Sequence, residues 1–175
     1  MKLKDKTIGI FIGPGFEDLE FWVPHMRMQE EGATVRVIGS KAGESFFSKH
    51  GCLTASAEVA AKDQKAGDYD ALIVPGGWCP DKIRRDPAIQ SLVKDVYDAG
   101  NIVGMICHAG LVGISAGIVG GHKATGSEGI KDDLINAGAE WIDESAFRDR
   151  NLVWGRVVAD IPNFCRELVA AIGDV

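Results

Sequence analysis

The chain has 175 residues, of which 46% are hydrophobic and 25% are charged, as in an average soluble globular protein. This length suits one domain, predicted over residues 1–175, and the composition excludes a disordered chain or a dense disulfide scaffold. The formal net charge of -6, without a basic stripe, argues against nucleic acid as a partner.

Location and cofactors can also be predicted from the composition. Residues 1–6 carry charges where a secretory signal peptide has its apolar core, so we expect a cytoplasmic protein. The cysteines at 52, 79, 107 and 165 lack the spacing of a metal site, and we expect free thiols, no metal and no cofactor. Residues 99–122 contain no Asp, Glu, Lys or Arg, but their glycines favour a buried strand and helix over a membrane span.

The first half of the chain alternates strand and helix patterns. A strand over 7–12 ends at Gly13-Pro14-Gly15, and Leu19, Trp22, Val23 and Met26 then recur at helical spacing, with a kink expected at Pro24. Further strands are predicted over 35–38 and 69–74, the second stopped by Pro75-Gly76-Gly77, with a less regular stretch between them.

The second half continues the alternation. Asp86-Pro87 begins a helix that ends at Gly100, and residues 102–106 form a continuous apolar strand. A helix over about 109–117, a strand over 152–158 and a C-terminal helix capped by Asp160 and Gly173 follow. This order predicts an α/β fold, a mostly parallel sheet with helices on both faces, which binds ligands at the carboxyl ends of its strands.

Two motifs resemble known sites but lack a residue or a position that those sites require. Gly13-Pro14-Gly15 begins like a dinucleotide-binding turn, but Asp18 occupies the third glycine position and would repel a pyrophosphate. The segment from Gly113 to Gly117 matches the serine hydrolase pattern, yet Ser115 falls inside a predicted helix rather than directly after a strand.

Cys107 has the position that a nucleophile elbow requires, between an apolar strand and a helix of small residues. We expect the helix start to lower the pKa of the thiol, although a buried structural cysteine fits nearly as well.

His108 is either a base for Cys107 or a polar residue at a helix start. Glu17 is either a first-turn carboxylate or a carboxyl beside the sulfur with a raised pKa. Cys52, Cys79 and Cys165 are expected to be packing residues, with Cys79 close to the site.

The ordered motifs resemble the PfpI-type intracellular proteases of the ThiJ/PfpI superfamily, related in fold to class I glutamine amidotransferases. The resemblance spans nearly the whole chain and is carried by Phe16-Glu17-Asp18, Pro75-Gly76-Gly77, Ile106-Cys107-His108, residues 114–117 and residues 129–141. It implies a flavodoxin-like three-layer sandwich, with Cys107 as nucleophile, His108 as its partner and Glu17 hydrogen-bonded to the sulfur. Backbone N–H groups near Gly77 and His108 would form an oxyanion hole, with Gly76, Trp78 and Ala109 also at the binding site.

Two residues depart from the family pattern. Asp81 stands where the family has a glutamate that reaches the histidine across a subunit interface, and Ser127 stands where an aromatic residue is common, so that Trp78 would supply the bulk. The shared site implies a homo-oligomer, a dimer, trimer or hexamer, with an interface over residues 78–85.

The predicted function is that of a cysteine hydrolase of the PfpI peptidase type, whose thiolate attacks a carbonyl of a peptide or small molecule. A deglycase or glutathione-independent glyoxalase acting on glyoxal or methylglyoxal adducts is the alternative within the same chemistry. A redox-sensing stress-response protein without turnover is the alternative from another class.

Overall fold

The computed structural model describes residues 1–175 and contains one seven-stranded sheet. The strand order is β10-β11-β7-β6-β1-β2-β5, and every pairing is parallel except that between β10 and β11. The strands of this sheet are β1 (Thr7–Phe11), β2 (Thr34–Gly39), β5 (Val59–Ala60), β6 (Ala71–Val74), β7 (Ile102–Ile106), β10 (Ala146–Asp149) and β11 (Leu152–Gly155). The fold is the predicted flavodoxin-like sandwich.

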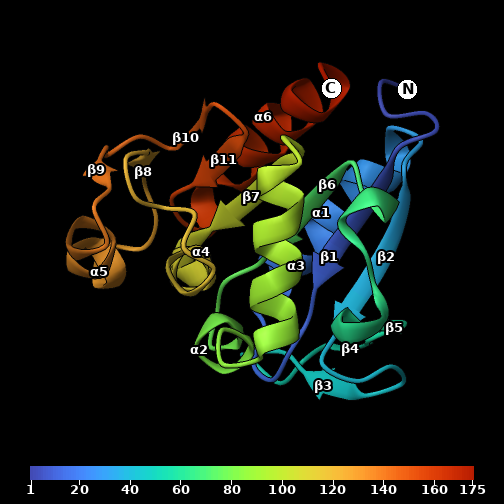
Figure 1. The fold of residues 1–175 in the computed structure, drawn as a ribbon. Coiled ribbons are helices and arrows are strands. Elements are labelled where there is room, and N and C mark those ends of the chain that lie inside the picture. The colour runs from blue at the N-terminus through green and yellow to red at the C-terminus, as the bar shows by residue number, and fades with distance from the viewer.

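Helices cover both faces of the sheet (Figure 1). On one face α1 (Asp18–Glu30) packs beside α6 (Ile161–Gly173), and on the other α3 (Pro87–Asp98) and α4 (Gly110–Ser115) pack against the central strands. The short helices α2 (Cys79–Ile83) and α5 (Lys131–Asn136) flank α4. Two small ribbons complete the fold, β3 (Ser45–Phe47) with β4 (Thr54–Ser56), and β8 (Lys123–Ala124) with β9 (Glu140–Trp141).

The core lies between the sheet and its helices and is one cluster of 49 buried residues. β6 and β7 are buried along their whole length, because helices cover both of their faces. The uncharged stretch 99–122 therefore belongs to the core as predicted, and no helix of the structure is long and apolar enough to cross a membrane.

The helix α1 forms where its apolar spacing predicted it, but the spacing marks the wrong face. Leu19, Val23 and Met26 are exposed, whereas Glu20, Phe21 and Met28 are buried against the sheet. The helix must turn Glu20 inward, toward the loop that follows β6, and this turns the apolar stripe outward. Acidic side chains are rarely fully buried, so a buried carboxyl at this end of the sheet indicates a candidate functional site.

The C-terminal helix begins at the predicted place without the predicted cap. Asp160 precedes α6, but its side chain makes no capping hydrogen bond and instead accepts one from Arg156 at 3.0 Å. The helix also runs through Gly173 instead of stopping before it.

Candidate active site

The site is built from three loops at the carboxyl ends of β1, β6 and β7, which are neighbours in the sheet. The loop after β1 pairs with the loop after β6, since Phe16 and Gly77 form an isolated β-bridge and the N–H of Glu17 donates to the carbonyl of Gly76. This pairing brings α1 to the residue that follows β7, which is Cys107.

Cys107 has a left-handed backbone, with a φ of 61°, which is strained for a residue with a side chain. The chain turns there from β7 directly into a 3-10 turn over Cys107–Ala109 and then into α4. Such a tight strand-to-helix turn projects the side chain out of the sheet edge. The structure therefore has an elbow at Cys107, whereas Ser115 lies at the end of α4 and accepts a hydrogen bond from Arg84.

Gly76 and Gly77 let the loop after β6 approach the sulfur. A Cβ at position 76 would lie 2.5 Å from Glu20 Oε2 and 2.8 Å from Cys107 Cβ, and Gly77 has a φ of 79°. The N–H groups of Gly77 and His108 both donate to Cys107. The N–H of Gly76 instead donates to Glu20 at 2.8 Å, so Gly76 supplies no free donor for an oxyanion.

The carboxyl beside the sulfur belongs to Glu20 and not to Glu17, which corrects the sequence-based assignment. Glu17 Oε2 accepts the N–H groups of Leu19 and Glu20, each at 2.9 Å, and so caps α1. Glu20 lies one turn further along the helix, is fully buried and hydrogen-bonds to Cys107. The signal that could have found it is the three-residue spacing from Glu17, which puts both side chains on the same side of the helix.

The thiol and the carboxyl act on each other's proton affinity. Burial, reinforced by the charge of Glu17, raises the pKa of Glu20 to about 7. Burial, reinforced by Glu20, raises the pKa of Cys107 to about 12, against the opposing effect of the His108 and Gly77 N–H groups. The expected lowering of the thiol pKa by the helix start is therefore wrong, because burial and a like charge outweigh the backbone donors.

His108 is the neighbouring imidazole. Its Nδ1 lies 3.2 Å from Cys107 Sγ, and burial, together with the cation of Lys49, lowers its pKa. The ring is consequently neutral at pH 7 and able to accept a proton. Sequence reasoning missed Lys49, whose Nζ also lies 5.0 Å from the centre of the Trp78 ring.

A pocket of about 740 Å³ opens beside His108. Trp78, Asp81 and Gly77 line it, together with Lys82, Arg84 and Asp133. Asp81 is exposed and pairs with Lys82 at 3.5 Å, without an ion pair or hydrogen bond to His108 of its own chain. Ala109 is fully buried in the core, and it is not among the residues that line the pocket.

The other cysteines and Ser127 lie in different environments. Cys79 and Cys165 are buried packing residues, whereas Cys52 is exposed, and all four thiols are free. Ser127 does lie near the site, because its N–H donates to the carbonyl of Cys107 at 3.0 Å.

Known proteins are similar to this chain in sequence and in fold. The DJ-1/PfpI family matches residues 6–171. The chain belongs to the DJ-1/PfpI family. The chain is 38% identical over 154 residues to a deglycase of Pyrococcus abyssi, covering 88% of this chain and 92% of that one. It is 35% identical to the deglycase PfpI of Pyrococcus furiosus, with the same two coverages.

Solved structures of DJ-1/PfpI proteins superpose closely on this one. A two-domain protein of Anabaena variabilis, with DJ-1/ThiJ/PfpI-like and ferritin-like domains, has a TM-score of 0.94 at 33% identity. The match covers 97% of this chain but 48% of that protein, so the chain spans about half its length. DJ-1β of Drosophila melanogaster has a TM-score of 0.88 at 21% identity, over 97% of this chain and 91% of that one, which shows the shared fold.

Proposed function

We propose that this protein is a Cys107-dependent deglycase, which releases an amine or thiol from its adduct with methylglyoxal or glyoxal and converts the dicarbonyl unit to a hydroxy acid. Curated relatives that match over about nine tenths of both chains are deglycases. This support places the deglycase reading ahead of the peptidase reading, although both use the same nucleophile.

The observation that carries the proposal is the set of groups around one sulfur. Cys107 Sγ has His108 Nδ1 at 3.2 Å, the Glu20 carboxyl on another side, and the N–H groups of Gly77 and His108 as donors. The sulfur supplies the nucleophile once a neighbouring base takes its proton, the two N–H groups that donate to it stabilise negative charge there, and two groups of different basicity exchange protons. Attack by sulfur on a carbon at the oxidation level of a carbonyl uses a nucleophile, hydrogen-bond donors for the developing negative charge and groups that transfer protons.

The first step exchanges the substrate's amine for the sulfur. A methylglyoxal–amine adduct has a carbinol carbon bonded to nitrogen, next to a ketone. The C–S bond forms there as the C–N bond breaks, while the Glu20 carboxylate takes the proton of the Cys107 thiol and passes it to the departing amine. The product bound to Cys107 is a hemithioacetal.

The second step is an internal redox isomerisation that needs no external oxidant. His108 removes the proton from the hemithioacetal carbon and a proton returns to the neighbouring ketone carbon, while the hydroxyl proton of the hemithioacetal is transferred to the ketone oxygen. The first carbon is thereby oxidised to a thioester while the second is reduced to an alcohol. Water then cleaves the C–S bond, which gives lactate and regenerates the thiol.

The pocket determines what the adduct is attached to. Its volume of about 740 Å³ and its charged lining, with Asp81, Lys82 and Arg84, suit a hydrated side chain or nucleobase that carries the adduct. Trp78 forms an aromatic wall next to His108, with their ring centres 6.5 Å apart.

The deciding experiment separates the adduct from the free dicarbonyl. Lactate formation is measured at a constant concentration of free methylglyoxal while the concentration of an N-acetyl-lysine adduct is raised. A deglycase becomes faster as the adduct increases, whereas a rate that depends only on free methylglyoxal identifies a glyoxalase. Cleavage of a fluorogenic peptide without lactate formation identifies a peptidase, and peroxide oxidation of Cys107 without turnover of any substrate identifies a redox sensor.

A further inference from the structure

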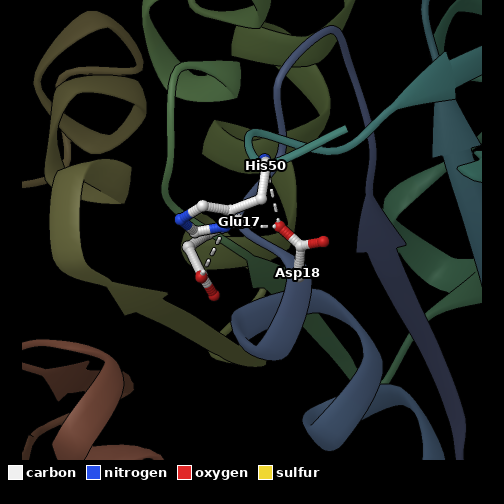
Figure 2. A group of neighbouring side chains, drawn as sticks. All are labelled: Glu17, Asp18 and His50. Atoms are coloured by element: carbon white, nitrogen blue, oxygen red, sulfur yellow. Dashed lines mark hydrogen bonds and ion pairs between the residues drawn. The ribbon is translucent and has the colours of Figure 1, made fainter. Parts of the chain in front are cut away.

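A second cluster of ionisable side chains lies at the start of α1, on the other side of Glu17 from its helix-capping bonds. Glu17, Asp18 and His50 bring one ligand atom each within 4.8 Å of one another (Figure 2). His50 comes from the loop between β3 and β4, far from α1 in the sequence. We infer that these three side chains form a binding site for a divalent transition metal ion of the zinc class.

The distances match those of a tetrahedral site. With metal–ligand bonds of about 2.0–2.2 Å, neighbouring ligand atoms in tetrahedral zinc lie roughly 3.3–3.6 Å apart. His50 Nδ1 lies 3.0 Å from Asp18 Oδ2 and 4.0 Å from Glu17 Oε1, so small side-chain rotations bring both pairs to this spacing. One imidazole and two carboxylates are ligands that zinc and its neighbours accept together.

The Glu17 carboxylate has a free oxygen directed into the cluster. Its Oε2 is saturated by two backbone N–H groups, while Oε1 faces His50 in Figure 2 and accepts no hydrogen bond from the protein. The Glu17 side chain as a whole is only 6% exposed, and Oε1 is its oxygen without a hydrogen-bond donor. A carboxylate on a largely buried side chain has lost much of its hydration, and a cation at this point would compensate its charge.

The surrounding structure holds the ligands in place. The side chain of Asp18 hydrogen-bonds to Ser48 as well as to His50. The loop that carries His50 is tied to α1's entry, since the N–H of Lys49 donates to the carbonyl of Phe16 at 2.7 Å. Metal sites need such outer partners to orient their ligands. The exposed His50 ring, at 61%, leaves an entry path and a fourth coordination position open to water.

An ion pair between His50 and Asp18 alone explains less of this arrangement. It accounts for the 3.0 Å contact but leaves Glu17 Oε1 with only a 4.0 Å ion-pair contact to the same imidazole, and it puts two carboxylates beside a single ring. A divalent ion compensates both charges. The inference concerns a site separate from the Cys107 nucleophile and does not depend on the proposed deglycase reaction.

The test uses Co²⁺ as an optical probe and Zn²⁺ as its competitor, with the full chain carrying Cys52→Ser and Cys107→Ser. These substitutions remove the exposed thiol near His50 and the active-site thiol, both of which would bind metal. We expect one equivalent of Co²⁺ to give a tetrahedral absorption spectrum that Zn²⁺ abolishes. In this background, Asp18→Asn and Glu17→Gln keep the side-chain shape and His50→Ala removes the nitrogen ligand, and each should weaken Co²⁺ binding by about tenfold or more.

His108→Ala is the matched control, because it removes the imidazole beside Cys107 instead of the one in the cluster and should leave Co²⁺ binding unchanged. Circular dichroism confirms that each variant is folded. Absence of stoichiometric Co²⁺ binding in the double-serine protein would overturn the inference. Equal affinity in His50→Ala and its parent, or loss of binding in His108→Ala, would overturn it as well.

Discussion

Glu20 and Cys107 share a hydrogen bond at the carboxyl ends of β1 and β7, and both are held by the loop that follows β6. Gly76 donates to the Glu20 carboxylate at 2.8 Å, and Gly77 donates to Cys107. The carboxyl and the thiol therefore titrate as a pair, which loses one proton near pH 7 and keeps the second to about pH 12. The remaining proton stays mainly on the sulfur, beside the Glu20 carboxylate.

This pairing predicts a break in the pH dependence of Cys107 alkylation. Above pH 7 the wild-type pair keeps a constant single proton, so the thiolate fraction stops rising. Glu20→Gln has a neutral side chain at every pH, and its thiolate fraction continues to rise about tenfold per pH unit. The two proteins should react with iodoacetamide at similar rates near pH 6, and the variant should be on the order of tenfold faster near pH 8.

Peptide mapping after brief alkylation measures these rates at Cys107 separately from those at Cys52. Glu17→Gln is the control, because its amide oxygen still accepts the two N–H groups that Glu17 caps, and its profile should keep a break, moved below pH 7 because the charge of Glu17 no longer raises the pKa of Glu20. A profile without a break in the wild type, or with the break removed by Glu17→Gln alone, would contradict the assignment of Glu20. Turnover should fall about 10²–10⁴-fold in Glu20→Gln, which cannot transfer a proton.

The raised pKa of Glu20 also predicts how stability changes with pH. The folded protein keeps the Glu20 proton from its ordinary 4.5 up to about 7, while the unfolded chain has already released it, so stability falls with rising pH across this window. At about 1.4 kcal/mol per tenfold change in proton affinity, the loss is on the order of 3 kcal/mol.

Urea unfolding at about pH 4 and pH 8 measures this effect as the difference between wild type and Glu20→Gln. From pH 4 to pH 8, the free energy of unfolding of Glu20→Gln should rise relative to that of the wild type by about 3 kcal/mol, since Gln has no proton to lose. A difference that does not change with pH would show that Glu20 ionises normally in the folded protein. Glu20→Ala should be less stable than Glu20→Gln by about 1–3 kcal/mol, because it leaves the buried N–H of Gly76 unsatisfied.

The sequence was sufficient for the fold because the alternation of elements is strong. The fully apolar run 102–106 forms a strand with the predicted bounds, and the Asp86 cap begins α3 as expected. Position at the end of that strand was also enough to find the elbow at Cys107. Small ribbons such as β8 with β9 were missed, because two-residue strands leave no periodicity.

The prediction that Glu17 contacts the sulfur was wrong because the motif gives the position of a residue in the chain but not the direction in which its side chain points. Glu17 and Glu20 both lie at the start of α1, and only the orientation of the helix on the sheet decides which one reaches Cys107. That orientation follows from the burial of Phe21 and Met28, which the exposed stripe of Leu19, Val23 and Met26 obscured in the sequence. The pKa of Cys107 was likewise misjudged, because burial depends on loops distant in the chain.

Asp81 provides a test of subunit sharing. It lines the pocket beside His108 but makes no ion pair or hydrogen bond with that histidine in its own chain, and the family resemblance implies that the acidic residue comes from a neighbouring subunit. If so, Cys107→Ser and Asp81→Ala proteins should each be inactive and should recover part of the activity when refolded together. Light scattering measures the oligomer in parallel. A fully active monomer would contradict the shared site.

Ser115 should be dispensable for catalysis. It lies at the end of α4 and accepts a hydrogen bond from Arg84 at 2.8 Å, away from the elbow. Ser115→Ala should leave kcat unchanged and cost about 1 kcal/mol of stability, as for the loss of one hydrogen bond to a charged group at a partly exposed site. A loss of kcat comparable to that of Cys107→Ser would identify a serine hydrolase instead.

The central claim is that a covalent bond between Cys107 Sγ and the dicarbonyl carbon lies on the reaction path. The direct measurement is mass spectrometry of the protein quenched with acid within one turnover of a methylglyoxal–lysine adduct. The account predicts a mass increase of one methylglyoxal unit on the peptide that contains Cys107, absent from the peptides of Cys52 and Cys165, together with loss of lactate formation in Cys107→Ser. Lactate formation at the wild-type rate in Cys107→Ser, without any modified peptide, would contradict it.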